Sequence, residues 1–371
     1  MLTTLFAAVA MLLTLALPTF PEGLTIAIVG YLGLVGLAGF GGFLRSAAAR
    51  KELALLSPWV IGLGLGLMVG IVRGNPMGQA LEDALCYILF VLGLCAGRGA
   101  SRPTWLLWSV LAVCVADVAI SLVRMPSYDL SRYRSTYLHF KVILGHPLVG
   151  LFCATFLHHL SRGRGVKAVL KAITVFLVVG VIFTVSRGMV LGMAMGALAW
   201  MYVRKPARGL IFGAIAAVLV AVFAASLFEL GQQYLRLGNQ ATVDGRVREI
   251  AECLSYFARM PVFGAGLGAE FVIDGFVVSY VHNMLAYHLW KFGLVGSALF
   301  ALPFLGLTRQ AMRIDRDARA LVFAGAAASL VYMITAASYK NYIVVPMIGM
   351  VVGAALRLRL PQAAKPPSVP A

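Results

Sequence analysis

The sequence predicts an all-α membrane protein that crosses the lipid bilayer many times. Hydrophobic residues make up 61% of the 371 residues and charged residues only 12%, about half the charged share of an ordinary soluble domain. Apolar runs of roughly 20 residues, the length needed to cross a hydrocarbon core, recur along the whole chain. We expect about twelve transmembrane helices, at residues 2–20, 24–43, 54–72, 84–97, 104–123, 142–160, 168–185, 188–203, 210–228, 283–306, 320–338 and 341–356.

Basic residues predict the orientation of these helices. Lys and Arg collect in alternate connections, and an excess of this kind marks the cytoplasmic side. Both termini are therefore expected in the cytoplasm. The first apolar run lacks a basic leader and a small-residue cleavage site, which indicates a retained helical hairpin. The connections expected in the cytoplasm hold Arg45, Arg50, Lys51, Arg98, Arg102, Arg162, Arg164, Lys167, Lys171, Arg204, Lys205, Arg208, Arg309, Arg313, Arg316, Arg319, Arg357, Arg359 and Lys365.

The basic residues of these connections contribute much of the net charge of +17. The positive charges are spread over short connections and do not form one basic domain, which argues against nucleic acid as a partner. Membrane topology and contacts to anionic membrane lipids explain most of them. The five cysteines show neither a disulfide framework nor a paired metal motif.

The outward face has two long connections, at 124–141 and 229–282, and long loops in membrane proteins usually carry function. We therefore divide the chain into three parts. Residues 1–228 form helices 1 to 9, residues 229–282 form an outward loop that contains short helices, and residues 283–371 form helices 10 to 12 with a short cytoplasmic tail.

The long loop contains a predicted amphipathic helix. It follows Asp244-Gly245, places Ile250, Leu254 and Phe257 at helical spacing, and stops at Pro261. A glycine cluster follows at 264, 266 and 268. No strand precedes that cluster, so we favour a flexible turn that returns the chain to the bilayer over a phosphate-binding turn.

Arginines are unexpectedly frequent on the outward face. Long translocated loops escape the positive-inside rule, which is an equally good explanation for many of them. Arg187 differs because it lies in a tight junction between two apolar helices, where an unpaired charge costs roughly 2.5 kcal/mol or more. It needs either a structural partner or an anionic ligand, and its planar fork suits phosphate. The other outward arginines are Arg73, Arg124, Arg132, Arg134, Arg236, Arg246, Arg248 and Arg259.

His282 opens the tenth apolar run at the same membrane face. The structural alternative is a histidine that anchors a helix end at the interface. The chemical alternative is a general base, because a neutral imidazole removes a proton from a hydroxyl group as that hydroxyl attacks an electrophile. Asn283 would then orient the imidazole or a sugar. His288 falls on another helix face, where packing or an internal hydrogen bond is expected.

The outward acids lack the spacing of a metal site, so we expect no metal cofactor. We expect these acids to pair with the surplus arginines instead, and Asp117, inside a span, to be neutral or paired. The outward acids are Glu82, Asp83, Asp129, Glu249, Glu252, Glu270 and Asp274.

Three motifs together resemble the O-antigen ligase and polymerase superfamily of bacterial inner-membrane glycosyltransferases. His282-Asn283 is followed, after nine residues, by Gly293 and then Gly296. "SRG" stands at 186–188, and "GR" at 245–246 precedes a short helix and "MPVFGAGLG". Each motif is weak alone, but their order and their shared membrane side make the set fairly specific.

This resemblance implies a glycosyltransferase of the GT-C type that takes a glycan from undecaprenyl diphosphate at the periplasmic face of the inner membrane. It implies that Arg187 and Arg246 bind the diphosphate and that His282 is the catalytic residue. Supporting contacts are expected from Asn283, Arg248 and Arg134. The simplest acceptor is lipid A core, which would place the protein in lipopolysaccharide biosynthesis.

The proposed chemistry also follows from the residue types. Guanidinium groups stabilise the charge that develops on a leaving diphosphate, and His282 takes the proton of the acceptor hydroxyl. Attack opposite the leaving group inverts the anomeric carbon. Paired arginines can take the electrostatic role of a metal ion, and none is expected.

Three alternatives stay open. A polymerase would use the same chemistry with another lipid-linked repeat unit as the acceptor. A transporter could bind an anion in the outward arginine cluster, but no inverted repeats and no matching residues toward the cytoplasm are apparent. A structural scaffold would bind an assembly partner through the long loop and would not need a titratable histidine.

Overall fold

The computed structural model describes a few positions between residues 34 and 44, and then residues 49–124, 146–183, 186–222, 240–273, 275–335, 337–342 and 344–359. Six helices in these ranges are long and apolar enough to cross a membrane, and four shorter apolar helices accompany them. The described elements are α3 (Ala49–Val72), α4 (Met77–Gly99), α5 (Pro103–Arg124), α7 (His146–Leu160), α8 (Arg164–Phe183), α9 (Arg187–Arg204), α10 (Pro206–Val222), α12 (Gln240–Arg259), β1 (Phe271–Ile273), β2 (Phe276–Val278), α13 (Met284–Met312), α14 (Arg316–Thr335), the 3-10 helix η4 (Ala337–Lys340) and α15 (Val344–Arg359).

The prediction of an all-α membrane protein is confirmed, since every predicted span from residue 54 onward corresponds to a helix. The spans at 2–20 and 24–43 lie wholly or largely outside the described residues, so the number twelve stays a prediction. Helix α4 begins at Met77, seven residues before the predicted start at 84, because it continues through the acidic pair Glu82 and Asp83. The short antiparallel hairpin β1–β2 was not predicted.

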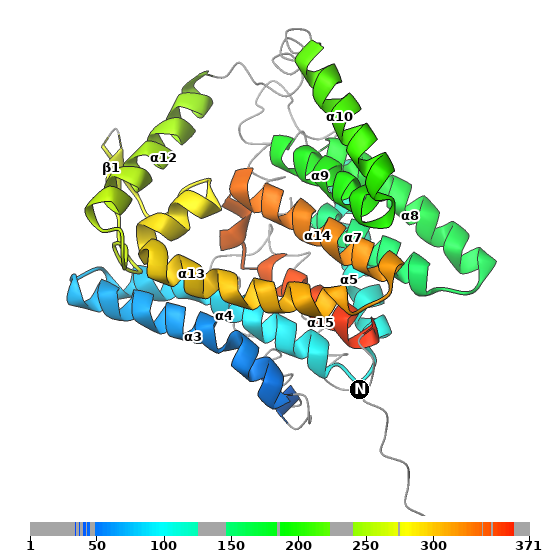
Figure 1. Cartoon of the computed structure of the whole chain (residues 1–371), viewed down its shortest axis with the longest axis horizontal. Coiled ribbons are helices and arrows are strands. Elements are labelled where there is room, and N and C mark those ends of the chain that lie inside the picture. Colours follow the sequence, from blue (N-terminus) through cyan, green and yellow to red (C-terminus); the bar gives the residue numbers. More distant parts are fainter. Residues whose placement is uncertain are drawn as a thin grey trace, which may run out of the picture.

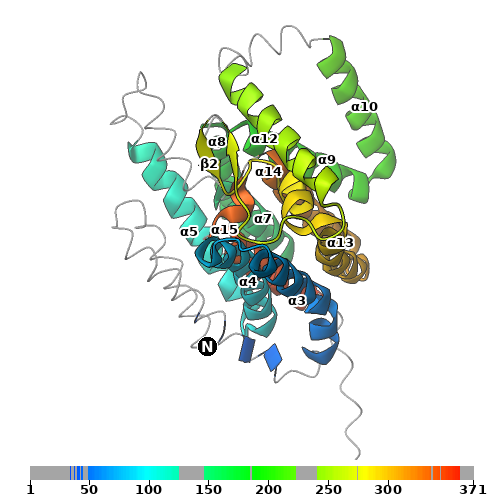
Figure 2. The same cartoon turned by 90° about the vertical axis from the view of Figure 1, so that its left-hand side faces the viewer.

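The elements of the long loop lie at one end of the helical bundle. Helix α12 and the β-hairpin sit beside the N-terminal end of α13, at the left in Figure 1 and facing the viewer in Figure 2. Helix α13 packs along α3, α15 packs along α4, and α14 packs along α9. Polar contacts at the opposite end join predicted cytoplasmic connections, for example Arg204 to Asp317 at 2.9 Å and Arg98 to Gln310 at 2.7 Å.

Two of these helix pairs approach closely because glycines line their interfaces. Gly93 and Gly97 of α4 face Gly349 and Gly353 of α15, and a Cβ at any of the four would collide with the main chain of the other helix. Small residues at this spacing let membrane helices touch backbone to backbone. Helix α9 approaches the main chain of α14 in the same way at Gly192 and Gly196, whereas Gly188 packs against the side chains of Thr335 and Tyr332.

Helix α13 is broken at Gly293, where the backbone has φ +60° and ψ −162°. The break removes the two helical bonds that Leu294 and Val295 would make to the carbonyls of Trp290 and Lys291. The connection after α12 replaces both of them. The two freed carbonyls accept from the amides of residues 265 and 266, at 2.7 and 2.9 Å, and the two freed amides donate to the carbonyls of residues 261 and 262, at 2.8 and 3.0 Å.

The three glycines of this connection are needed for that docking. Gly264, Gly266 and Gly268 all have positive φ, and a Cβ on Gly264 or Gly266 would collide with the backbone of α13 or α3. Six consecutive residues, 264–269, are buried. The expected flexible turn is therefore wrong, because the segment is packed between two membrane helices and bonded to both of them.

Helix α12 confirms the predicted helix, although it begins at Gln240, before the predicted start. The predicted apolar face is wrong at Leu254, which is 44% exposed, because Cys253 takes the innermost position. The inner face of α12 buries Cys253 completely, whereas Val247 on the other face is 59% exposed. The helix ends at Arg259, two residues before Pro261. It thereby leads directly into the segment that bonds to the break in α13.

Replacing Gly293 by Ala should destabilise the protein. The added Cβ would meet the main chain of Val262 and Gly264, and an L-residue at this backbone conformation costs about 1–3 kcal/mol. Thermal unfolding of the detergent-solubilised protein measures the effect. Gly64→Ala on α3 is the matched control, because nothing lies within 4 Å of its Cβ. Equal unfolding midpoints for the two variants would contradict the role given to Gly293.

Candidate active site

His282 lies where the β-hairpin meets α13. Asn283, the next residue, is the N-cap of α13, and its side-chain oxygen accepts a hydrogen bond from the Ala286 amide at 2.9 Å. Such a cap satisfies one of the free amides at a helix start. Asn283 therefore holds the end of the helix, and His282 is fixed immediately before it.

Glu249 of α12 binds His282 at two points. One carboxylate oxygen accepts from the His282 backbone amide at 3.0 Å, and Nδ1 of the imidazole lies 3.0 and 3.2 Å from the two carboxylate oxygens. Both side chains are about one-fifth exposed, at 22% for His282 and 19% for Glu249. The pair joins the amphipathic helix to the start of α13 and stays open to solvent.

The electrostatic surroundings keep Glu249 ionised. Burial by itself raises the pKa of this carboxyl group, but the side-chain and backbone hydrogen bonds from His282 oppose it, together with the charges of His282 and Arg246. The net result is a pKa below its ordinary value. An ionised carboxylate only accepts hydrogen bonds, so Nδ1 of a neutral His282 carries the proton and Nε2 carries the lone pair. Within the described part of the chain, Nε2 has no hydrogen-bond partner.

Arg246 lies one helical turn before Glu249. Its guanidinium donates to the Thr335 carbonyl at 3.2 Å, at the C-terminal end of α14. Gly188 of the "SRG" motif packs against the same Thr335. The structure therefore brings the start of α9, with the backbone of Arg187, to the place where Arg246 is anchored.

Arg187 is the first residue of α9, and Ser186 caps that helix by accepting from the Met189 amide. A helix N-terminus carries a partial positive charge and free amides, which attract anions. The Arg187 side chain lies outside the described part of the structure. Of the other predicted supporting residues, Arg248 is exposed on α12 and Arg134 lies outside the described residues.

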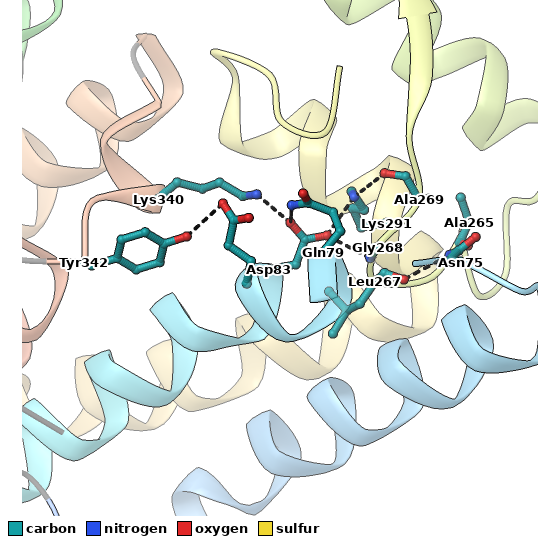
Figure 3. Close-up of polar contacts among 11 residues, drawn as sticks. Asn75, Gln79, Asp83, Ala265, Leu267, Gly268, Ala269, Lys291, Lys340 and Tyr342 are labelled. Atoms are coloured by element: carbon teal, nitrogen blue, oxygen red, sulfur yellow. Dashed lines mark hydrogen bonds and ion pairs between the residues drawn. The ribbon is translucent and has the colours of Figure 1, made fainter. Parts of the chain in front are cut away.

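A buried ionic cluster, which sequence reasoning missed, lies next to this site. Asp83 of α4 receives Lys291 of α13 at 2.7 Å and Lys340 of η4 at 2.5 Å. It also accepts from the Gly268 amide at 2.9 Å, and Lys291 donates to the Ala269 carbonyl at 2.5 Å. Figure 3 shows the two lysines reaching the carboxylate from different sides. The cluster holds the glycine-rich segment to α4 and α13.

The cluster and the histidine are linked through the chain around η4. The Tyr339 hydroxyl donates to the carbonyl of Val281 at 2.5 Å, directly before His282. The Tyr280 ring lies 6.0 Å from the imidazole, between ring centroids, and the Lys340 ammonium lies 5.7 Å from the Tyr280 ring centroid. The Tyr280 ring therefore lies between the Lys340 ammonium and the His282 imidazole.

The expectation that outward acids pair with arginines holds for Glu252, which lies 3.8 Å from Arg259. It is wrong for Asp83, which binds two lysines, and Glu82 accepts from the Tyr342 hydroxyl at 3.0 Å. Glu249 binds His282 directly, and the nearby charge of Arg246 also lowers its pKa. The expected internal bonds of His288 are confirmed, to the Met284 carbonyl at 2.7 Å and the Tyr87 hydroxyl at 3.0 Å. Lys291 in an apolar span was the signal that the sequence offered for the missed cluster.

Metal ligands do not gather at this site. No group of three or more His, Cys, Asp or Glu residues suited to a metal ion occurs among the residues that the structure describes. The described contacts of the His282 side chain are with Glu249 and the Tyr280 ring, and Arg246 is held at Thr335 by a separate hydrogen bond.

The fold and the site define a multi-pass membrane protein with a polar site built at one end of its helices. The family model described as O-Antigen ligase matches residues 172–301. This segment runs from α8 into α13 and contains Arg187, Arg246, Glu249 and His282. The match confirms the resemblance to the O-antigen ligase superfamily and supports a membrane enzyme of the ligase or polymerase type. No curated protein matches the chain.

Replacing Glu249 by Gln should remove an acid-sensitive part of the stability. The pKa of Glu249 is lowered from its ordinary value of 4.5, so its contacts contribute fully above about pH 4.5 and are lost as the pH falls through the lower value of the folded protein. Charge-assisted hydrogen bonds of this kind are worth about 1.5–3 kcal/mol. Unfolding measured from pH 3 to 7 should show the wild-type advantage over Glu249→Gln vanish at the acid end. A constant difference at every pH would contradict the assignment.

Proposed function

We propose that the protein is an O-antigen ligase-like glycosyltransferase of the inner membrane. It transfers a glycan from undecaprenyl diphosphate to an acceptor hydroxyl, most simply on lipid A core, at the periplasmic face and with inversion. The observation that carries this proposal is the 3.0 Å contact between Glu249 and Nδ1 of His282, because it leaves the opposite nitrogen free to accept a proton. Support also comes from the family match, which spans both residues.

The reaction begins with the acceptor hydroxyl at Nε2 of His282. Its oxygen attacks the anomeric carbon of the donor sugar, and a new glycosidic bond forms as the bond between that carbon and the diphosphate oxygen breaks. The diphosphate leaves with the bonding electron pair, and the hydroxyl proton passes to Nε2. Attack from the face opposite the leaving group inverts the anomeric configuration.

Glu249 is a positioning residue in this scheme. It holds the proton on Nδ1, fixes the ring plane, and stabilises the imidazolium that forms when Nε2 takes the acceptor proton. The bond from the same carboxylate to the His282 amide fixes the backbone as well as the ring. The imidazole therefore does not have to be oriented when the acceptor arrives.

The leaving diphosphate requires positive charge near the anomeric carbon. Arg246 would supply one guanidinium from α12, and Arg187 a second from the start of α9. Each charge-assisted hydrogen bond that strengthens as the charge develops is worth about 1.5–3 kcal/mol. The anchoring of Arg246 on Thr335 keeps its guanidinium close to the α9 N-terminus, which favours the same anion.

A polymerase would use the same residues with a second lipid-linked repeat unit as the acceptor. Incubating the purified protein with a lipid-linked donor and each acceptor separately distinguishes the two reactions. We expect product with lipid A core, and equal product after treatment with a chelator, since the cationic side chains take the electrostatic role of a metal. Product only with a repeat unit would identify a polymerase, and loss of product with the chelator would contradict metal independence.

Replacing His282 by Ala should lower the rate of glycan transfer by about 10²–10⁴, the usual contribution of a general base. His159→Ala is the matched control, because His159 lies at the other end of the bundle and contacts Asp315. Membrane insertion and unfolding midpoints establish that both variants fold. Full activity of His282→Ala would remove the assigned role.

Replacing Arg246 by Ala should lower the transfer rate by roughly tenfold or more, since one charge-assisted contact to the leaving diphosphate is lost. Arg187→Ala should behave similarly. Arg208→Ala, an exposed position on α10, tests for a general effect of removing positive charge. The measurement is steady-state transfer at several donor concentrations, and an unchanged rate for Arg246→Ala would exclude it from the diphosphate site.

A further inference from the structure

The buried cluster around Asp83 contains one more cation than its carboxylate requires. Lys291 and Lys340 each bind a different oxygen of Asp83, at 2.7 and 2.5 Å. A single lysine would already neutralise the buried charge. Desolvating a second ammonium group costs free energy, so its presence is weak evidence for a stabilising role.

The two lysines are not equivalent. Lys291 is completely buried and also donates to the Ala269 carbonyl, so it holds two elements together. Lys340 is 9% exposed, and its hydrogen bond among the described residues is to Asp83. If Lys340 moves away, Asp83 keeps Lys291 and the Gly268 amide, at 2.9 Å. Moving Lys340 leaves no buried carboxylate without a cation, whereas moving Lys291 would also break its bond to the Ala269 carbonyl. Of the two lysines, Lys340 is therefore the one that can exchange partners.

Lys340 also lies on the side of the cluster that adjoins the active site. Its ammonium is 5.7 Å from the Tyr280 ring centroid, and that ring is 46% exposed and 6.0 Å from the His282 imidazole. The residue before Lys340 donates to the Val281 carbonyl. A short displacement of a flexible lysine side chain would bring its charge toward the histidine, while the backbone of η4 stays bonded.

We propose that Lys340 is a releasable anion-binding residue, which exchanges Asp83 for an anionic oxygen group of a glycan substrate bound beside Tyr280 and His282. This inference rests on the proposed glycan transfer. The ligand chemistry is a phosphate or a carboxylate, carried either by the lipid-linked donor or by the acceptor. The exposed Tyr280 ring offers an apolar face for the sugar that carries this group.

The test compares wild type, Lys340→Gln, Lys340→Arg and Lys205→Gln in steady-state transfer assays, with donor and acceptor varied in turn. Lys205 is exposed between α9 and α10, far from the site, and Lys205→Gln controls for the loss of one charge. We expect Lys340→Gln to raise the KM of one substrate about tenfold or more, Lys340→Arg to restore much of it, and Lys205→Gln to match wild type. The affected substrate identifies the carrier of the anion.

Unchanged KM values for both substrates in Lys340→Gln would overturn the proposal, provided that the wild type transfers glycan. Absence of transfer by the wild type would instead contradict the proposed function. A measurement on wild-type protein avoids any folding defect of the variants. Saturating substrate should change the rate at which acetic anhydride acetylates Lys340, because the ammonium group leaves Asp83, and should leave Lys205 unaffected. Equal labelling of Lys340 with and without both substrates would also overturn the proposal.

Discussion

The hydrogen bonds between the broken helix α13 and the glycine-rich segment are the constraint on which the site depends. Unpaired backbone groups within a membrane protein cost several kcal/mol each, so a helix interrupted at Gly293 needs substitute partners. The segment after α12 supplies two donors and two acceptors to the two amides and two carbonyls that the break releases. Neither element satisfies its main chain in this conformation without the other.

This mutual completion determines where α12 can lie. Because the segment at 261–266 is bonded to α13 at its break, the end of α12 is held beside that break. Glu249, further back along α12, then lies within hydrogen-bonding distance of His282 at the start of α13. Asp83 and Lys291 reinforce the arrangement from the other side, since they bind Gly268 and Ala269 in the same segment. The buried ionic cluster does not contact the imidazole. It helps to position it by holding the backbone of the glycine-rich segment.

The sequence predicted the parts of this structure that follow from local composition. Hydropathy located every described membrane helix, and spacing located the amphipathic helix, because each pattern is decided by neighbouring residues. The partners of Asp83 and Glu249 could not be found this way, since Lys291, Lys340 and His282 are remote in the chain and come together through helix packing. The prediction of a flexible turn at the loop glycines was wrong for a related reason. Their positive φ angles are required by contacts with α3 and α13, which no local pattern reveals.

The spacing within the His282 motif has a mechanical explanation in this fold. Asn283 caps α13, and the nine residues that follow, 284–292, form a helical segment about 14 Å long that ends at the break. One end of this helical segment is bonded to the glycine-rich segment, and His282 lies just before the other end. A helix of fixed length therefore sets both the distance and the direction from the glycine-rich segment to the imidazole. The chain meets this segment again at two points, through Glu249 of α12 beside the cap and through Pro261, two residues after α12, at the break. The distance from Glu249 to Pro261 therefore has to match the length of the segment. Histidine, glycine and the intervening spacing therefore act as one unit, in which the glycine fixes where the histidine stands relative to its carboxylate.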